Sequence, residues 1–320
     1  MKTLRIFLLL SFILSTTSHA IEDQDPKLVK YQFGHHQISE LKVLNSHDHV
    51  QTQQPENAAY ELRESTVTAK LFDGQKQFKI KFNYYHSYVE GKRPLFLVLP
   101  PIVGWTPLDK GVAETLAFNG IDVILPEIED IFTTGRSTKE VEDFMVDFTI
   151  TMKLLIQRVN TDATLNIDRD KVGVFGMSLG AVIAGSFVGM INEIKYAFIL
   201  AGGGNLAEIS EKSEQWKVKA FKKYILQSGE ASESDWTLTI QTAFSFDPLH
   251  FAENAKLDGK KIFMVMCKED LIIPFGLQKQ LWQAYGQPPA REVGFYSHLG
   301  TIIQWFMRSR FELIDFIKKN

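Results

Sequence analysis

Short apolar runs alternate with longer amphipathic stretches from about residue 90 to the end of the chain. The runs 95–99, 121–125, 172–175, 196–200 and 261–267 are mostly apolar and have the length of buried strands. Amphipathic stretches separate them. Because parallel strands buried on both faces need crossover helices between them, this alternation predicts a mostly parallel sheet covered by helices on both faces.

Two stretches predict individual helices. One is expected from about Pro107 to Phe118. The other begins at Ser137-Thr138-Lys139-Glu140, a pattern typical of a capping box. Apolar residues then recur every three or four positions, which predicts a stripe facing the core and not a cofactor-binding motif; they are Val141, Phe144, Met145, Phe148, Met152, Leu155 and Ile156.

The region before residue 90 predicts an antiparallel start to the sheet. Thr66 to Phe72 and Phe78 to Tyr84 read as strands on either side of Asp73-Gly74. That dipeptide favours a tight hairpin turn. We therefore expect an N-terminal antiparallel hairpin joined to the parallel strands.

The chain divides into three expected regions. Residues 1–20 predict a signal peptide, residues 21–59 form a polar N-terminal extension, and residues 60–320 form one large domain. Within that domain, about 205–247 separates two core strands by more than one crossover helix requires. This segment is expected to be a helical, cap-like insertion.

The first 20 residues have the pattern of a cleaved secretory leader. Met1 to Arg5 is basic, Ile6 to Leu14 is apolar, and Ser18-His19-Ala20 suits cleavage after Ala20. The apolar run is shorter than the roughly 20 residues that span a bilayer, and no cysteine lies nearby for lipid attachment. An exported protein, periplasmic or secreted, without a stable membrane anchor is predicted.

Charge and cysteine content exclude several classes of function. Removal of the leader changes the formal net charge from −3 to −5. The sequence contains no cluster of basic residues that would predict binding to nucleic acid. Cys267 is the only cysteine, so the chain has no internal disulfide, and a buried residue is expected there. His47-Asp48-His49 lacks further ligands and is interpreted as surface, so no metal or cofactor site is predicted. The sequence leaves the oligomeric state open.

The segment Gly176-Met177-Ser178-Leu179-Gly180 carries the strongest chemical signal. It follows the apolar run 172–175 and precedes small residues suited to a helix packed on the sheet. G-x-S-x-G between a strand and a helix is typical of a nucleophile elbow, whose serine projects from a strained turn. Ser178 is therefore the candidate nucleophile.

A serine nucleophile needs a base and an acid, and both follow Ser178 in the chain. Asp270 comes just after the run 261–267. His298 follows a short strand expected over Val293 to Tyr296, with a helix from about Thr301. Because the carboxyl ends of parallel strands share one edge of the sheet, we expect the three side chains to meet.

Other residues remain alternatives for these roles. Glu269 is the main alternative acid, and Asp247 and Asp258 are more remote choices. His250 is the only other histidine after Ser178, but it precedes the acid and lies in a segment interpreted as insertion. A surface or cap position is expected for it.

Residues from about 60 to 320 resemble the α/β-hydrolases, most nearly bacterial dienelactone hydrolases and related carboxylesterases. Three blocks carry the resemblance: Asp168 to Gly180, Glu269 to Pro274 and Ser297 to Gly300. It implies an α/β-hydrolase fold and cleavage of a small-molecule carboxylic ester through an acyl-serine, without metal or organic cofactor. Thioesterase or small peptidase activity with the same residues, and a non-catalytic binding protein of this fold, are the alternatives.

One departure from that family concerns the oxyanion hole. Many relatives carry His-Gly after the third strand, whereas this chain reads Leu99-Pro100-Pro101-Ile102-Val103-Gly104. Oxyanion donors are usually backbone N–H groups, which proline lacks. Leu179 and Ile102 are therefore the expected donors, with Val103 as the alternative to Ile102.

Overall fold

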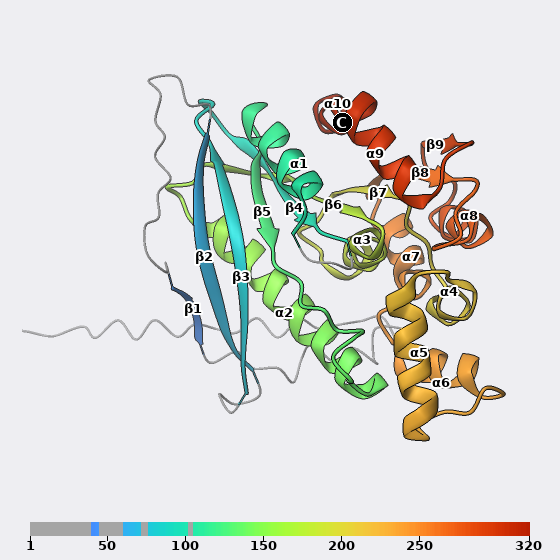
Figure 1. The fold of residues 1–320 in the computed structure, drawn as a ribbon. Coiled ribbons are helices and arrows are strands. Elements are labelled where there is room, and N and C mark those ends of the chain that lie inside the picture. Colours follow the sequence, from blue (N-terminus) through green and yellow to red (C-terminus); the bar gives the residue numbers. More distant parts are fainter. Residues whose placement is uncertain (1–39, 45–59, 72–75, 102–104) are drawn as a thin grey trace, which may run out of the picture.

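The computed structural model describes residues 40–44, 60–71, 76–101 and 105–320 (Figure 1). Its strands are β1 (Glu40–Leu44), β2 (Tyr60–Leu71), β3 (Lys76–Ser87), β4 (Arg93–Leu99), β5 (Asp122–Pro126), β6 (Ile167–Met177), β7 (Tyr196–Leu200), β8 (Lys261–Cys267) and β9 (Ala290–Val293). Its helices are α1 (Pro107–Phe118), α2 (Thr138–Thr161), α3 (Leu179–Met190), α4 (Leu206–Lys212), α5 (Trp216–Ser228), α6 (Trp236–Ala243), α7 (Pro248–Leu257), α8 (Phe275–Ala284), α9 (His298–Ser309) and α10 (Phe311–Lys319).

The described strands form one mixed sheet in the order β1-β2-β3-β5-β4-β6-β7-β8-β9. Strands β4 to β9 run parallel to one another, whereas the pairs β1–β2, β2–β3 and β3–β5 are antiparallel. The predicted mixed sheet with an antiparallel start is confirmed. Both hairpin strands extend further than predicted, with Tyr60 opposite Ser87, and the turn at Asp73-Gly74 lies outside the described residues.

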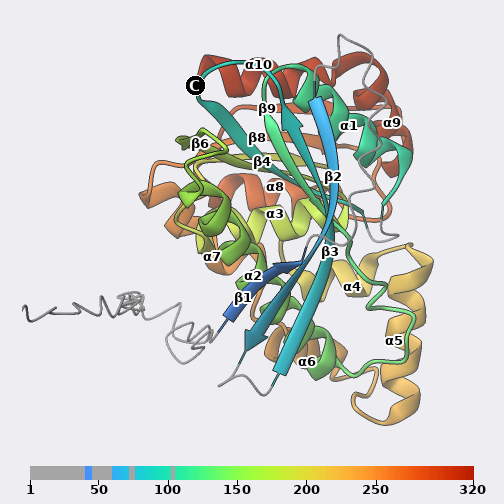
Figure 2. The ribbon, with the colours of Figure 1, turned by 90° about the vertical axis from the view of Figure 1, so that its left-hand side faces the viewer.

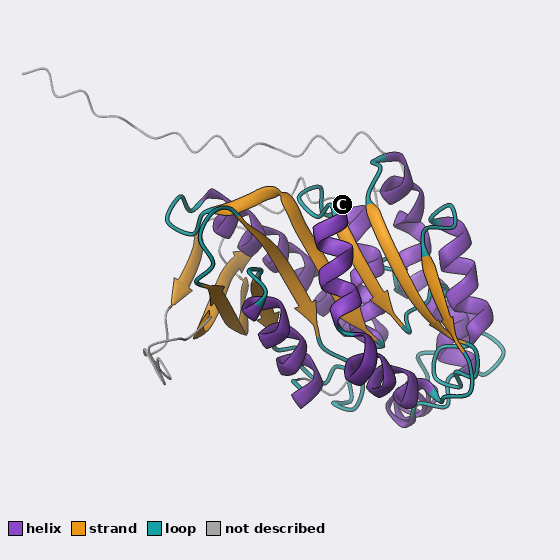
Figure 3. Ribbon diagram, turned by 90° about the horizontal axis from the view of Figure 1, so that it is seen from above, coloured by secondary structure: helices purple, strands orange, loops and turns teal. Residues whose placement is uncertain are grey.

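Helices cover both faces of this sheet because its central strands are apolar on both sides (Figures 1 and 3). Alternate residues of β4 point to opposite faces. Leu95, Leu97 and Leu99 pack with residues of α2, α3 and α7. Phe96 and Val98 pack on the other face with residues of α1, α9 and α10.

The two predicted helices begin and pack as expected. Helix α1 spans Pro107–Phe118, and α2 starts after Ser137, whose hydroxyl accepts a hydrogen bond from the backbone N–H of Glu140. The carboxylate of Glu140 accepts from the backbone N–H of Ser137 in return. All seven residues of the predicted apolar stripe on α2 are buried in the core.

The predicted strand over Val293 to Tyr296 is wrong. Strand β9 ends at Val293, and Phe295 has a φ of 67°, which does not continue a strand. The helix predicted from Thr301 instead begins at His298. Ser297 caps it, because its hydroxyl accepts from the backbone N–H of Gly300.

Four helices, α4 to α7, lie between β7 and β8. Helices α4, α5 and α6 sit together at one corner of the molecule, near the start of α2 (Figures 1 and 2). The Glu230 carboxylate that follows α5 accepts a 3.0 Å hydrogen bond from the Thr138 backbone N–H of α2. Helix α7 packs on α3 and belongs to the core, so His250 at its start is not part of the insertion.

The expected leader and most of the polar extension lie outside the described residues, and export stays a prediction. The helices in the described part of the chain are all too short or too polar to cross a lipid bilayer.

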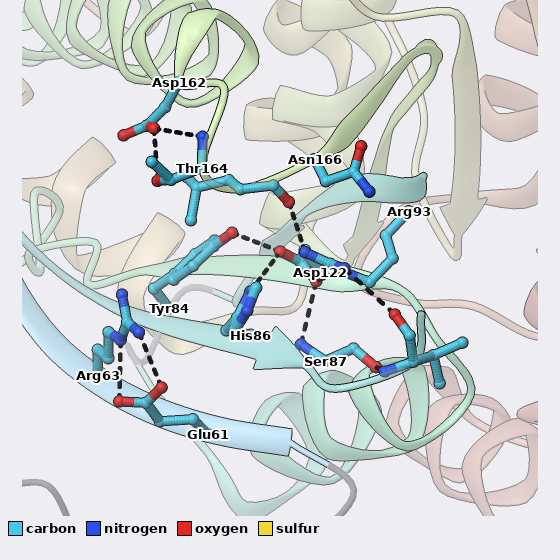
Figure 4. Close-up of polar contacts among 12 residues, drawn as sticks. Glu61, Arg63, Tyr84, His86, Ser87, Arg93, Asp122, Asp162, Thr164 and Asn166 are labelled. Atoms are coloured by element: carbon cyan, nitrogen blue, oxygen red, sulfur yellow. Dashed lines mark hydrogen bonds and ion pairs between the residues drawn. The ribbon is translucent and has the colours of Figure 1, made fainter. Parts of the chain in front are cut away.

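A buried carboxylate joins the antiparallel strands to the parallel ones (Figure 4). Asp122, at the start of β5, is fully buried. One of its oxygens accepts from Arg93 Nε at 2.9 Å and from the Ser87 N–H at 3.0 Å. The other accepts from the Tyr84 hydroxyl at 2.5 Å and His86 Nδ1 at 3.0 Å. The network therefore links β3, β4 and β5.

These partners also set the charge of Asp122. Burial by itself raises the pKa of this carboxyl, but the hydrogen bonds from His86 and Tyr84 outweigh it and hold the pKa below its ordinary value. The carboxylate is thus stabilised in its charged form beside the Arg93 guanidinium, which also donates to the Leu165 carbonyl.

We expect Asp122→Asn to lower the free energy of unfolding by about 3 kcal/mol at pH 7, because it leaves the buried Arg93 charge unpaired. The pKa of Asp122 is lower in the folded than in the unfolded state, where an aspartate titrates near 3.9. Its contribution is therefore complete above that value and lost as pH falls through the folded-state pKa. Urea unfolding at pH 7 and at decreasing pH measures both effects.

The matched control is Asp170→Asn, at an exposed position on β6. A change within about 0.5 kcal/mol is expected there. Equal losses in the two variants at pH 7 would show that the Asp122 network does not stabilise the fold.

Candidate active site

Ser178 lies at the sharp turn between β6 and α3. Its φ of 56° and ψ of −122° are unusual for a residue with a side chain. A Cβ at Gly176 would lie 2.1 Å from the Gly180 carbonyl oxygen, and one at Gly180 would lie 2.2 Å from the Leu99 carbonyl oxygen. Both positions therefore require glycine, and the turn has the geometry expected of a nucleophile elbow.

Asp270 lies in the loop after β8 and is 5% exposed. Its Oδ1 accepts hydrogen bonds from the backbone N–H groups of Ile272 at 2.8 Å and Ile273 at 2.9 Å. Its Oδ2 accepts from His298 Nδ1 at 2.6 Å. Each carboxylate oxygen is thus held, and one of them is aimed at the histidine.

His298 connects Asp270 to Ser178. As the first residue of α9, it is fixed by the cap that Ser297 provides. Its Nε2 lies 2.8 Å from Ser178 Oγ. Because a carboxylate only accepts, Nδ1 donates to Asp270, and Nε2 of the neutral ring is left to accept from the serine hydroxyl. The structure thus brings the three predicted residues into one buried chain of hydrogen bonds.

The alternative acids lie elsewhere. Glu269 is exposed, and so is Asp258 beyond the end of α7. The Asp247 carboxylate accepts from the backbone N–H groups of Leu206 and Leu249, and so connects the insertion to the start of α7. Asp270, and not one of these three residues, therefore accepts the hydrogen bond from His298.

The alternative histidine is also outside the site. His250 is exposed, and its Nδ1 lies 3.1 Å from the Ser245 carbonyl oxygen. Since a carbonyl accepts, this nitrogen donates to the loop before α7. His250 therefore holds a neighbouring turn of its own chain segment and makes no hydrogen bond to Ser178 or Asp270.

Gln278 is a site residue that the sequence did not reveal. It is fully buried on α8, and its Nε2 donates to Asp270 Oδ2 at 3.1 Å and to the Ile273 carbonyl at 2.7 Å. Its Oε1 accepts from the Cys267 backbone N–H at 2.9 Å. One amide thus connects the end of β8, the acid and the following loop. The sequence offered one indication of this role, a polar glutamine next to Leu277 on the face of the helix that is buried.

Cys267 is buried as expected. Its thiol donates to the Tyr296 carbonyl at 3.2 Å and accepts from the Thr301 hydroxyl at 3.1 Å. Burial raises the pKa of this thiol, which keeps it protonated and poorly nucleophilic.

The structure describes one of the two residues expected to donate to the oxyanion. Leu179 is the first residue of α3, so its backbone N–H has no acceptor within the helix and lies beside Ser178. Ile102 and Val103 lie outside the described residues. The oxyanion hole therefore stays a prediction. In the described part of the chain, no group of three or more metal-ligating side chains comes together.

An apolar pocket opens beside Ser178 and Leu179. The insertion between β7 and β8 covers it with residues such as Leu206, Ile209 and Phe221. Trp216, by contrast, is 62% exposed and does not line the pocket.

Comparison with known proteins supports the fold. No protein-family model and no curated protein matches the sequence. Among solved structures, an acetyl xylan esterase from Paenibacillus sp. R4 is similar with a TM-score of 0.61 at 12% identity, covering 88% of this chain and 89% of that one. The Pyrococcus furiosus esterase Pf2001 has a TM-score of 0.56 at 15% identity, covering 88% and 99%.

A further similar structure is the acylaminoacyl peptidase of Pyrococcus horikoshii, with a TM-score of 0.56 at 11% identity over 89% of this chain and 50% of that one. Such low identities establish the architecture and not the activity. Together with the mixed sheet and its covering helices, they show that this chain has the α/β-hydrolase fold.

Proposed function

We propose that the protein is an exported serine hydrolase that cleaves carboxylic esters through an acyl-serine intermediate. The observation that carries this proposal is the buried chain of hydrogen bonds from Asp270 through His298 to Ser178. The esterases of similar fold support the choice of ester, and the leader-like residues 1–20 support export. The closer resemblance to the dienelactone-hydrolase branch rests on sequence motifs alone.

In the proposed reaction, His298 Nε2 takes the Ser178 proton while Oγ attacks the acyl carbon. The Leu179 N–H donates to the oxyanion that forms, and Asp270 stabilises the imidazolium. His298 then protonates the leaving alcohol, and the acyl group remains on the serine. Water, deprotonated by the same histidine, attacks the acyl-serine, which releases the acid and returns the proton to Ser178.

Thioesters and amides would react through the same steps, and the acylaminoacyl peptidase of similar fold makes the amide a specific alternative. Matched ester, thioester and amide substrates with one acyl group rank these leaving groups. A fluorophosphonate probe separates all of them from a non-catalytic binding protein, because only an activated serine reacts with it.

We expect Ser178→Ala to abolish fluorophosphonate labelling and to reduce ester turnover to background. Loss of the nucleophile costs about 10⁶-fold in a well-studied serine protease. Ser234→Ala, at an exposed position after α5, is the control and should label like the wild type. A Ser178→Ala protein that kept a tenth of wild-type activity would refute the nucleophile.

Asp270→Asn should lower kcat by about 10⁴-fold, because the amide no longer orients His298 or stabilises its charged form. Glu269→Gln, at the adjacent exposed position, should leave kcat nearly unchanged. Initial rates with a p-nitrophenyl ester, on variants whose circular dichroism matches the wild type, provide the comparison. The opposite ranking would make Glu269 the acid.

Gln278 is expected to act as a positioning residue through Asp270. Gln278→Met keeps the size of the side chain but removes its bonds to the acid, so we expect kcat to fall about 10- to 100-fold with KM unchanged. Gln280→Met, at an exposed position on the same helix, is the control. A lower yield of folded protein with normal kcat per labelled site would show that Gln278 is only structural.

A further inference from the structure

The pocket beside Ser178 is lined by the insertion, by α2 and α3, and by Ile272 and Ile273 of the loop after β8. Leu206, Ile209, Val218 and Phe221 line it from the insertion, and Val141 and Val182 line it from α2 and α3. Ser178 and Leu179 are also among its lining residues. A group bound in the pocket would therefore contact both the proposed nucleophile and the proposed oxyanion donor.

Few side chains along this pocket are polar, and Ser210, Ser213 and Gln215 each make a hydrogen bond within the protein. Gln215 Oε1 accepts from the Lys217 backbone N–H at 3.2 Å. The Ser210 hydroxyl donates to the Ala207 carbonyl at 2.7 Å and accepts from Trp236 Nε1 at 3.1 Å. The Ser213 hydroxyl accepts from the Gln215 backbone N–H at 3.2 Å. No charged side chain is found among the described lining residues. A polar ligand group would lose its hydration there without replacement, so the pocket favours hydrocarbon.

The position of the pocket indicates which part of an ester it takes. The leaving alcohol must lie next to His298, which protonates it. The described lining includes Ser178 and Leu179 but not His298. The pocket therefore extends from the acyl carbon on the side away from the proton donor, which is the acyl side of the substrate.

The size of the pocket limits the length of the acyl chain. Its free volume is about 80 Å³. An apolar cavity of about 150 Å³ binds one benzene molecule, so this pocket has room for a short chain of about three or four carbons beyond the carbonyl. An acetyl group would leave most of this space unfilled, whereas a 16-carbon chain would exceed it.

We propose that this pocket is the acyl subsite and that the substrates are esters of unbranched apolar acids of about four to six carbons. The inference rests on the proposed function, since it assumes attack by Ser178. Burial of each methylene should raise kcat/KM by about fourfold until the pocket is filled.

The test uses p-nitrophenyl esters from acetate to palmitate with the full chain. We expect kcat/KM to rise at least tenfold from acetate to hexanoate and to fall again by palmitate. A profile that is flat or falls from acetate to hexanoate would overturn the subsite. If fluorophosphonate labelling of Ser178 is intact in the same preparation, the proposed function survives that result; without labelling, both fail.

The second test fills the pocket with a larger side chain and measures kcat/KM for a long and a short ester. Val218 is half-buried on α5 and lines the pocket, so Val218→Trp should lower kcat/KM for hexanoate at least tenfold and leave acetate within about twofold. Leu238→Trp places the same side chain at a 65% exposed position on α6 and should change neither. Equal losses for both esters in a Val218→Trp protein that labels normally would contradict the proposal. If that variant does not fold, the wild-type chain-length profile decides alone.

Discussion

The sharp turn between β6 and α3 is the constraint on which the site depends. Helix α3 starts so close to the sheet that the backbone at Leu99 and Gly180 leaves no room for a Cβ at Gly176 or Gly180. Ser178 is held at positive φ as a consequence, and this places its hydroxyl beyond the edge of the sheet. The cost of this backbone conformation is offset by the core that surrounds it, since the apolar residues of α3 and β6 are almost all buried.

The other groups of the site reach Ser178 because the parallel strands end at one edge of the sheet. Asp270 follows β8 and His298 begins α9, and the two meet only when β6, β7, β8 and β9 stand side by side. Gln278 adds a fixed contact from α8 to the acid. At the opposite end of the strands, Asp122 joins the antiparallel hairpin to the parallel strands. The proposed catalytic residues and the buried Asp122–Arg93 ion pair thus occupy separate ends of the sheet, so a change at one is expected to leave the other intact.

The insertion between β7 and β8 has a different physical character from the sheet. Its inner surface contributes apolar side chains to the pocket, and its ends are fixed by specific polar contacts, with Asp247 at the start of α7 and Glu230 against the start of α2. The sheet and α3 set the position of the reacting atoms, whereas the insertion sets the shape of the space beside them. If the proposed function holds, substrate preference therefore depends on residues of the insertion as well as on the neighbours of the proposed catalytic residues.

The sequence by itself determined the features that are local. Apolar periodicity located β7, β8, α1 and the stripe of α2, the cap at Ser137 fixed the start of α2, and the Gly-x-Ser-x-Gly turn identified Ser178. Tertiary structure decided the features that depend on distant contacts. The end of β9 depends on its register with β8, the role of Gln278 depends on the loop that carries Asp270, and α7 joins the core because α3 presents a face to it. The pocket likewise exists only where the insertion meets α2 and α3. Periodicity shows that a side chain is buried, but the groups that surround it are fixed only when the chain has folded.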